Sequence, residues 1–234
     1  MARVAVTLVL AAVAFAWGAG PADAQAVRNF FEAEQLEYRL GGGADSLNWE
    51  AQGWLGGDYN KAWLKTQGAS VTGGDVERAE LQLLYSRTIA PSWDLQVGGR
   101  YDARPDPSRG YGVLGVQGLA PYFFEVDAAA FVSNEGDLSA RLEAEYELLL
   151  TQRLIAKPSV ELNFAVQEVR ELEIGSGLSD VELGFRLRYE IVREVAPYIG
   201  VAWERKVGRT ADLARRAGEE VDDVKLLVGV RFWF

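Results

Sequence analysis

The sequence of 234 residues contains no cysteine and no histidine, and its single methionine is Met1. Without cysteine, neither a disulfide bond nor a lipid-modified cysteine can form. Without histidine or cysteine, the usual bases and nucleophiles of hydrolases are missing, and only carboxylate chemistry stays open. After residue 24, no apolar run approaches the roughly 20 residues that a membrane-spanning helix needs. These absences argue against a helical membrane protein, a disulfide-stabilised domain and most enzyme classes.

Positive charge is also scarce, because 24 basic residues face 34 acidic ones and the formal net charge is −10. An acidic chain is a poor partner for nucleic acid and for anionic lipid headgroups. We therefore expect no nucleic-acid partner. Glycine, with 25 residues, and aromatic residues, at 11%, are abundant, as they are in barrels with tight turns and interfacial girdles.

The first 24 residues have the features of a secretory signal peptide. Arg3 precedes an apolar run from residue 4 to about residue 17, and the small-residue pattern Ala22-Asp23-Ala24 follows. The apolar run is too short to span a membrane, which disfavours the alternative of a retained anchor. We expect cleavage before Gln25 and a mature chain of residues 25–234.

Twelve segments alternate between apolar and polar residues with the period of two that is typical of β-strands. In the clearest, the apolar Leu138, Leu142 and Tyr146 share one face and the charged Arg141 and Glu145 share the other. An amphipathic helix would instead need apolar residues three and four positions apart. The predicted strands are 34–41, 46–56, 60–68, 76–87, 93–103, 111–120, 122–133, 138–150, 154–166, 179–191, 197–207 and 223–234.

A strand face with arginine and glutamate at successive alternate positions cannot face lipid, so it must line a lumen. The links between the predicted strands support this interpretation, because tight turns such as IAPS (89–92) alternate with long charged segments such as QEVRELEIGSG (167–177) and VGRTADLARRAGEEVDD (207–223). Outer-membrane barrels have this asymmetry, with the short turns in the periplasm. We predict an all-β fold, an antiparallel transmembrane β-barrel of about 12 strands, with both termini periplasmic. The alternative is a soluble β-sandwich.

The last strand carries an apolar row of Val224, Leu226, Val228, Val230, Phe232 and Phe234. We expect this row to face lipid, and the aromatic residues 232–234 to lie at the membrane interface. The strand should pair with the first strand and close the barrel, which removes exposed edges. A terminal phenylalanine in this setting also resembles the signal read by outer-membrane assembly machinery.

Several long motifs resemble the copper resistance protein B family. They include LEYRLGGGADSLNWEAQGWLGGDYNKAWLKTQG (36–68), GSGLSDVELGFRLRYEI (175–191), REVAPYIGVAWERKVG (193–208) and the final FWF. The resemblance runs from about residue 34 to residue 234. It implies a protein of the cell outer membrane that takes part in copper tolerance. It also implies copper as the metal and periplasmic copper-handling proteins, such as a multicopper oxidase, as partners.

The sequence departs from this family where copper would bind. Members typically carry a His- and Met-rich segment before the barrel, whereas here only residues 25–33 precede the first predicted strand. Copper(I) prefers thiolate and thioether ligands and copper(II) prefers imidazole, and the mature chain has none of them. We therefore expect weak or indirect copper binding. The organisation predicted is a signal peptide (1–24), a short periplasmic segment (25–33) and an outer-membrane barrel (34–234).

The candidate metal ligands are acidic residues of the longest external segment. These residues are Glu219, Glu220, Asp222 and Asp223. Their carboxylates could serve as oxygen ligands for a hard cation, and the alternative is that they form the solvated end of a loop.

Three functions stay open at this point. The first is a barrel of copper homeostasis, and the second is a small passive pore or structural barrel. The third is an enzyme that uses inward-facing carboxylates. The simpler interpretation of these carboxylates is that they form a ladder of ion pairs with inward-facing arginines inside the barrel. The residues expected to point inward are Arg141, Glu143, Glu145, Glu147, Arg186 and Arg188.

Overall fold

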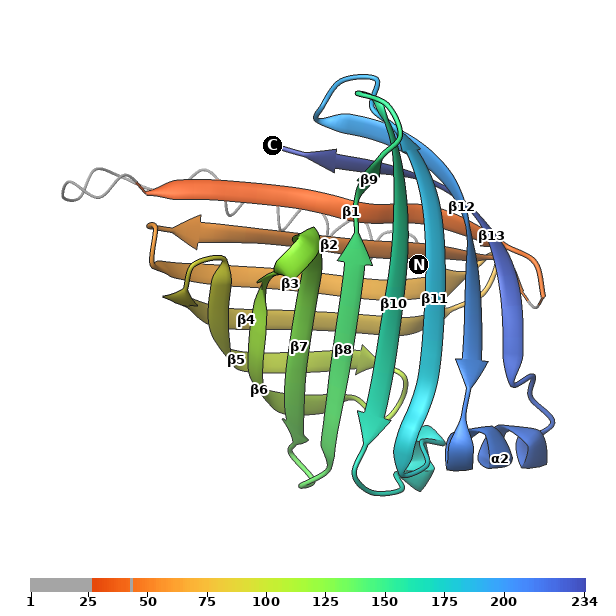
Figure 1. Ribbon diagram of the computed structural model, residues 1–234. Helices are drawn as coiled ribbons and strands as arrows, with labels where there is room; N and C mark the ends of the chain where they lie inside the picture. The colour runs from red at the N-terminus through yellow and green to blue at the C-terminus, as the bar shows by residue number, and fades with distance from the viewer. Residues whose placement is uncertain (1–26, 43) are drawn as a thin grey trace.

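The computed structural model describes residues 27–42 and 44–234, so the predicted leader of residues 1–24 lies outside them. The described residues form a closed antiparallel β-barrel of twelve strands (Figure 1). Neighbours in the barrel are neighbours in the chain, and pairing of β10 with β11 and of β13 with β1 completes the ring. Among the described helices, none is long and apolar enough to cross a membrane.

The strands reproduce all twelve predicted segments, and most boundaries differ by three residues or fewer. One strand is interrupted at Glu147, which divides it into β8 and β9, and both parts pair with β10. The strands are β1 (Arg28–Leu40), β2 (Ser46–Gly56), β3 (Asn60–Val71), β4 (Val76–Ala90), β5 (Trp93–Arg104), β6 (Arg109–Ala120), β7 (Phe124–Ser133), β8 (Leu138–Tyr146), β9 (Leu148–Leu149), β10 (Leu154–Ala165), β11 (Gly177–Tyr189), β12 (Val195–Lys206) and β13 (Asp222–Trp233).

The first strand begins at Arg28 and not at residue 34, so most of the predicted periplasmic segment 25–33 belongs to the barrel. The reason is a β-bulge: Ala33 pairs with Ala51 and Gln35 pairs with Glu50, which leaves Glu34 as an extra residue. A bulge shifts the alternation by one position. The segment before it is therefore out of phase with the segment after it, and the period of two is lost when the two are read together.

The outer surface of the barrel is apolar. Leu83, Leu114, Ile199, Val224 and Leu226 are each 57–62% exposed. Monomeric soluble proteins rarely expose a contiguous apolar surface of this extent. This surface is the lipid-facing belt of an outer-membrane barrel.

The last strand closes the barrel as predicted. Trp233 pairs with Glu32 and Phe232 with Ala33, while the backbones of Phe31 and Phe234 exchange two hydrogen bonds of 3.0 Å. The rings of Phe31 and Phe234 also pack, with their centroids 5.1 Å apart. The aromatic end of β13 is therefore part of the seam between the first and the last strand.

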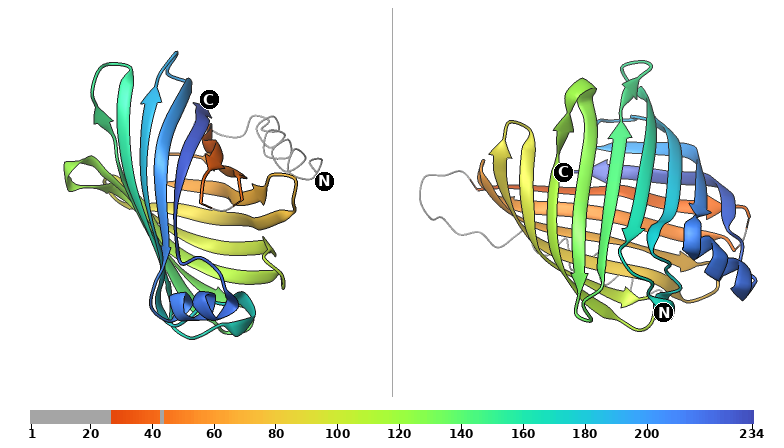
Figure 2. Two further views of the ribbon diagram at one scale, coloured as in Figure 1. Left: turned by 90° about the vertical axis from the view of Figure 1, so that its right-hand side faces the viewer. Right: turned by 60° about the horizontal axis from the view of Figure 1, so that its bottom comes forward.

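The two ends of the barrel differ in their connections. At one end the links are short, and exposed aromatic residues such as Tyr59, Tyr122 and Phe123 mark the turns. At the other end lie the segment 166–176, with the 3₁₀ helix η3 (Arg170–Leu172), and the helix α2 (Gly208–Ala217) (Figures 1 and 2). By the rule for outer-membrane barrels, the end with the short turns faces the periplasm.

Helix α2 was not predicted from the sequence, which indicated a loop there. Its buried residues Thr210, Ala211 and Ala214 lie on one face, and the helix packs mainly on β11. Gly218 ends the helix in the left-handed conformation, and its N–H donates to the carbonyls of Ala214 and Arg215.

Candidate functional site

The lumen contains charged side chains that pair across the barrel. Glu37 of β1 is fully buried and accepts hydrogen bonds from Arg39 Nε at 2.8 Å, from Arg186 Nε and Nη2 at 3.0 Å, and from the Tyr198 hydroxyl at 3.0 Å. Arg39 also binds Glu204 at 2.5 Å. Burying a carboxylate is tolerated only when it is paired and hydrogen-bonded, as Glu37 is.

A second network centres on Glu80 of β4. Its carboxylate binds Arg100 Nη2 at 2.9 Å and Arg141 Nη2 at 3.0 Å, and it accepts hydrogen bonds from the Gln67 and Gln82 amides. Arg141 reaches Glu80 from β8, on another part of the wall. The contact between Arg141 and Glu80 therefore links β8 with β4, two strands that are not adjacent in the barrel.

A third network lies around Lys157 of β10. Its ammonium binds Glu145 at 2.6 Å and also contacts Glu34, the extra residue of the bulge. The next residue, Gln35, also points inward, because its amide donates to Glu50 at 2.7 Å. The bulge thus places two consecutive side chains in the lumen, which a regular strand cannot do.

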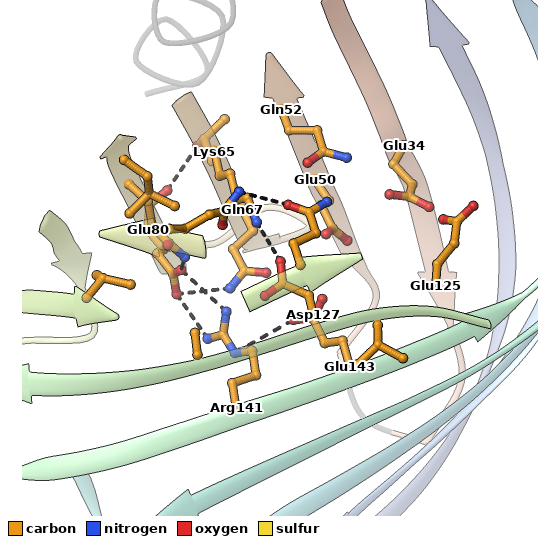
Figure 3. Close-up of a pocket in the computed structure, with 18 of the residues that line it drawn as sticks. Glu34, Glu50, Gln52, Lys65, Gln67, Glu80, Glu125, Asp127, Arg141 and Glu143 are labelled. Carbon is orange, nitrogen blue, oxygen red and sulfur yellow. Dashed lines mark hydrogen bonds and ion pairs between the residues drawn. The ribbon is translucent and has the colours of Figure 1, made fainter. Parts of the chain in front are cut away.

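A cavity of about 280 Å³ lies between these networks (Figure 3). Its lining is mostly polar, with an apolar part formed by Leu84, Val113 and Phe131, which pack with Trp63 into a small cluster inside the barrel. The charged residues that line the cavity are Glu34, Glu50, Lys65, Glu80, Glu125, Asp127, Arg141, Glu143 and Glu145. In Figure 3, Arg141 reaches Glu80, and Glu34 and Glu125 lie on another side of the cavity.

The acidic candidates of the external segment do not converge. Glu219 forms an ion pair of 2.6 Å with Lys206, and Asp223 lies 3.5 Å from Lys225. Asp222 and Asp223 are consecutive in β13 and so point to opposite faces. Among residues 27–42 and 44–234, no group of three or more Asp or Glu side chains is arranged to hold a metal ion.

Ion pairs also connect the long loops to one another. Arg209 of α2 donates to Glu168 at 2.7 Å, and this hydrogen bond lowers the pKa of the half-buried Glu168 carboxyl. The hydrogen bond from Lys206 likewise lowers the pKa of Glu219. Arg109 binds Glu171 at 2.6 Å, and the Gly175 N–H donates to the Thr210 hydroxyl at 3.0 Å. The segment 166–176 is thus tied to both the barrel rim and α2.

The predicted ion-pair ladder is confirmed. Arg186 binds Glu37, Arg188 binds Glu147 at 2.8 Å, and Glu145 binds Lys157, all inside the barrel. The acidic residues of β1 and β2 that face these groups were not predicted from the sequence. Glu37 and Arg39 occupy alternate positions in the sequence, and this pattern indicates that both side chains face the lumen. Glu34 gives no such signal, because it enters the lumen only through the bulge.

The chain matches known copper resistance proteins over most of its length. The family model for the copper resistance protein B precursor matches residues 27–234. Copper resistance protein B from Escherichia coli is 46% identical over 201 residues, which are 86% of this chain and 68% of that protein. A copper resistance protein B homolog from Pseudomonas syringae pv. tomato is 42% identical over 209 residues, 89% of this chain and 71% of that protein.

Solved structures with the same fold are outer-membrane barrels. The NanC porin superposes with a TM-score of 0.55 at 13% identity and covers 88% of this chain and 99% of its own. The outer membrane phospholipase A from Escherichia coli gives 0.52 at 16% identity, with 86% of this chain and 89% of its own covered. Such low identities establish the fold alone. The sequence matches and the lipid-facing barrel together show that the chain belongs to the copper resistance protein B family and is an outer-membrane protein of copper resistance.

Proposed function

We propose that this barrel supports copper tolerance as a non-catalytic component that has no tight copper site within residues 25–234. The observation that carries the proposal is the chemistry of the lumen. Its polar side chains are carboxylates, amides, hydroxyls, guanidiniums and ammoniums, and the mature sequence has no imidazole, thiol or thioether. Oxygen ligands alone suit hard cations better than copper.

The pairing of the interior carboxylates supports a non-enzymatic role. Glu37 and Glu80, which are both buried, are each bound by an arginine within 3.0 Å. A general acid or base must exchange a proton with a substrate. A carboxylate held by a cation in this way is stabilised in its charged form and is poorly suited to that exchange.

Copper would then be bound by partners and not by the barrel. We infer that these partners are periplasmic copper-handling proteins, for which a multicopper oxidase is the expected type. The short-turn end of the barrel faces them. The external acidic residues Glu219, Glu220, Asp222 and Asp223 would contribute at most weak, superficial binding of Ca²⁺, Mg²⁺ or Cu²⁺.

A complementation experiment tests this proposal. A strain lacking the gene should lose copper tolerance, and the wild-type gene should restore it. A variant in which the four external acidic residues are replaced by Gln or Asn should restore it as well. If the deletion leaves tolerance unchanged, the role in copper tolerance is refuted. If the four replacements abolish tolerance at normal barrel levels, the external segment is a functional copper site.

The cavity of about 280 Å³ favours a second candidate, a passive pore for small solutes. Reconstitution in planar bilayers distinguishes the two. Ion conductance that is independent of copper, in a protein whose deletion does not alter copper tolerance, would support the pore.

A further inference from the structure

Packed side chains fill two parts of the lumen. One part, against β3 to β7, is the apolar cluster described above, whose members are 2–8% exposed: Trp63, Leu84, Val113 and Phe131. The other part lies against β12 and β13, where Tyr198 and Leu227 are 4% and 1% exposed. The cavity of about 280 Å³ is bounded by the apolar cluster and by Glu34 and Glu145, which contact Lys157. Movement of a solute through the lumen therefore depends on what closes this cavity.

An ion pair joins two separate walls of the cavity. Lys65 of β3 and Asp127 of β7 both line the cavity (Figure 3), and the Lys65 Nζ lies 2.5 Å from the Asp127 Oδ2. Three strands, β4, β5 and β6, separate β3 from β7 in the barrel. The Lys65 ammonium also lies 5.6 Å from the centre of the Trp63 ring, so the pair runs along the apolar cluster. The two side chains therefore meet by extending across the lumen.

A second contact crosses the lumen beside the first and is held more firmly. Arg141 of β8 binds Glu80 of β4 at 3.0 Å, and the Glu80 side chain is 1% exposed. Glu80 is also bound by Arg100 and by the amides of Gln67 and Gln82. Separating a buried charge from several partners at once is costly, so this contact stays formed.

The Lys65–Asp127 pair is the weaker of the two contacts. The side chains of Lys65 and Asp127 are 17% and 26% exposed, and each forms this one ion pair within the described part of the chain. Ion pairs with access to solvent contribute little to stability and are screened by salt. The stem of a lysine is flexible, so the side chain can turn back toward its own strand. The pair can therefore open and close while the Glu80 network holds the two walls in place.

We propose that the Lys65–Asp127 pair is a gate in the lumen. The formed pair closes the cavity to solutes, and small ions pass when the two side chains separate. A barrel with this gate is closed most of the time, which distinguishes it from the passive pore considered above. The gate depends neither on copper binding nor on the role in copper tolerance, so its test is separate from the complementation experiment.

Single-channel recordings of the purified mature protein in planar bilayers test the gate. The wild-type protein should be closed most of the time. Asp127→Ala should raise the fraction of time in the conducting state about tenfold or more, as expected for the loss of a hydrogen bond between charged groups. Glu125→Ala is the matched control, because Glu125 also lies on β7 and lines the cavity, but has no ion pair within residues 27–42 and 44–234. It removes the same charge from the same cavity and leaves the pair intact, so it should conduct as the wild type does.

Exchanging the two charges separates the effect of the pair from the effects of charge and volume. Lys65→Asp combined with Asp127→Lys rebuilds the pair in the opposite direction and should return the conducting fraction to that of the wild type. A wild-type barrel that is open most of the time would overturn the proposal. Equal conduction by Asp127→Ala and Glu125→Ala, or an exchanged variant that stays open, would overturn it as well.

Heat-modifiable migration on gels reports whether each variant folds. Lys65→Gln breaks the same pair, and it takes the place of Asp127→Ala if that variant does not fold. If the exchanged variant does not fold, the comparison of the pair-breaking variant with Glu125→Ala decides.

Discussion

Replacing Glu37 by alanine should strongly destabilise the barrel. Glu37 is the fully buried acceptor of four hydrogen bonds, from Arg39, Arg186 and Tyr198. Its removal leaves two buried arginines with fewer partners. Breaking a buried ion pair from one side costs about 3–5 kcal/mol. Arg39 keeps Glu182 and Glu204, and Arg186 keeps Gln35, so we expect the lower part of this range, about 3 kcal/mol.

Unfolding in urea, followed by tryptophan fluorescence in lipid vesicles, measures this change in the free energy of unfolding. Lys206→Ala is the control, since it removes an ion pair with Glu219 in which both side chains are more than 40% exposed. Exposed pairs contribute about 0–1 kcal/mol. Equal effects of Glu37→Ala and Lys206→Ala would refute the conclusion that the lumen networks stabilise the barrel.

Three other predictions follow from the fold. Deleting Phe232–Phe234 should reduce the amount of heat-modifiable barrel in outer membranes, because the seam with β1 is lost; normal levels would contradict this. Mass spectrometry of the mature protein should find Gln25 at its N-terminus, and retention of residues 1–24 would refute the predicted leader. The pairs Arg209–Glu168 and Lys206–Glu219 lower the pKa values of the Glu168 and Glu219 carboxyls. Their contribution to the stability of the folded loops is therefore present above about pH 4.3 and is lost as the pH falls through the lowered pKa values. Hydrogen-exchange protection in residues 166–176 should therefore decrease on acidification below pH 4, and unchanged protection would argue against this coupling of the loops.

The fold could be predicted from the sequence because a barrel wall with lipid on one side and charge on the other forces a strict alternation. Leu183 and Phe185 face outward and Arg186 and Arg188 face inward, as the period of two requires. The beginning of β1 could not be predicted in the same way, because the bulge at Glu34 breaks the period. Helix α2 could not be predicted because the charges of this segment favour a solvated loop, although residues 213–217 (LARRA) are good helix formers and are followed by Gly218.

The candidate site was only partly predictable. Alternation identifies inward-facing Arg141 and Glu143 on one strand, but not the strand that lies opposite them. Glu80 and Glu50 meet these residues only through closure of the barrel. The four acidic residues of the external segment are close in sequence, yet strand geometry and the lysines beside them keep them apart.

The central claim is that an outer-membrane protein of copper resistance has no tight copper site in its own mature chain. Calorimetric titration of the purified protein, residues 25–234, with copper(II), and with copper(I) under reducing conditions, tests it most directly. We predict dissociation constants of about millimolar to high micromolar, the range of flexible oxygen sites. A stoichiometric site of nanomolar affinity would contradict the account.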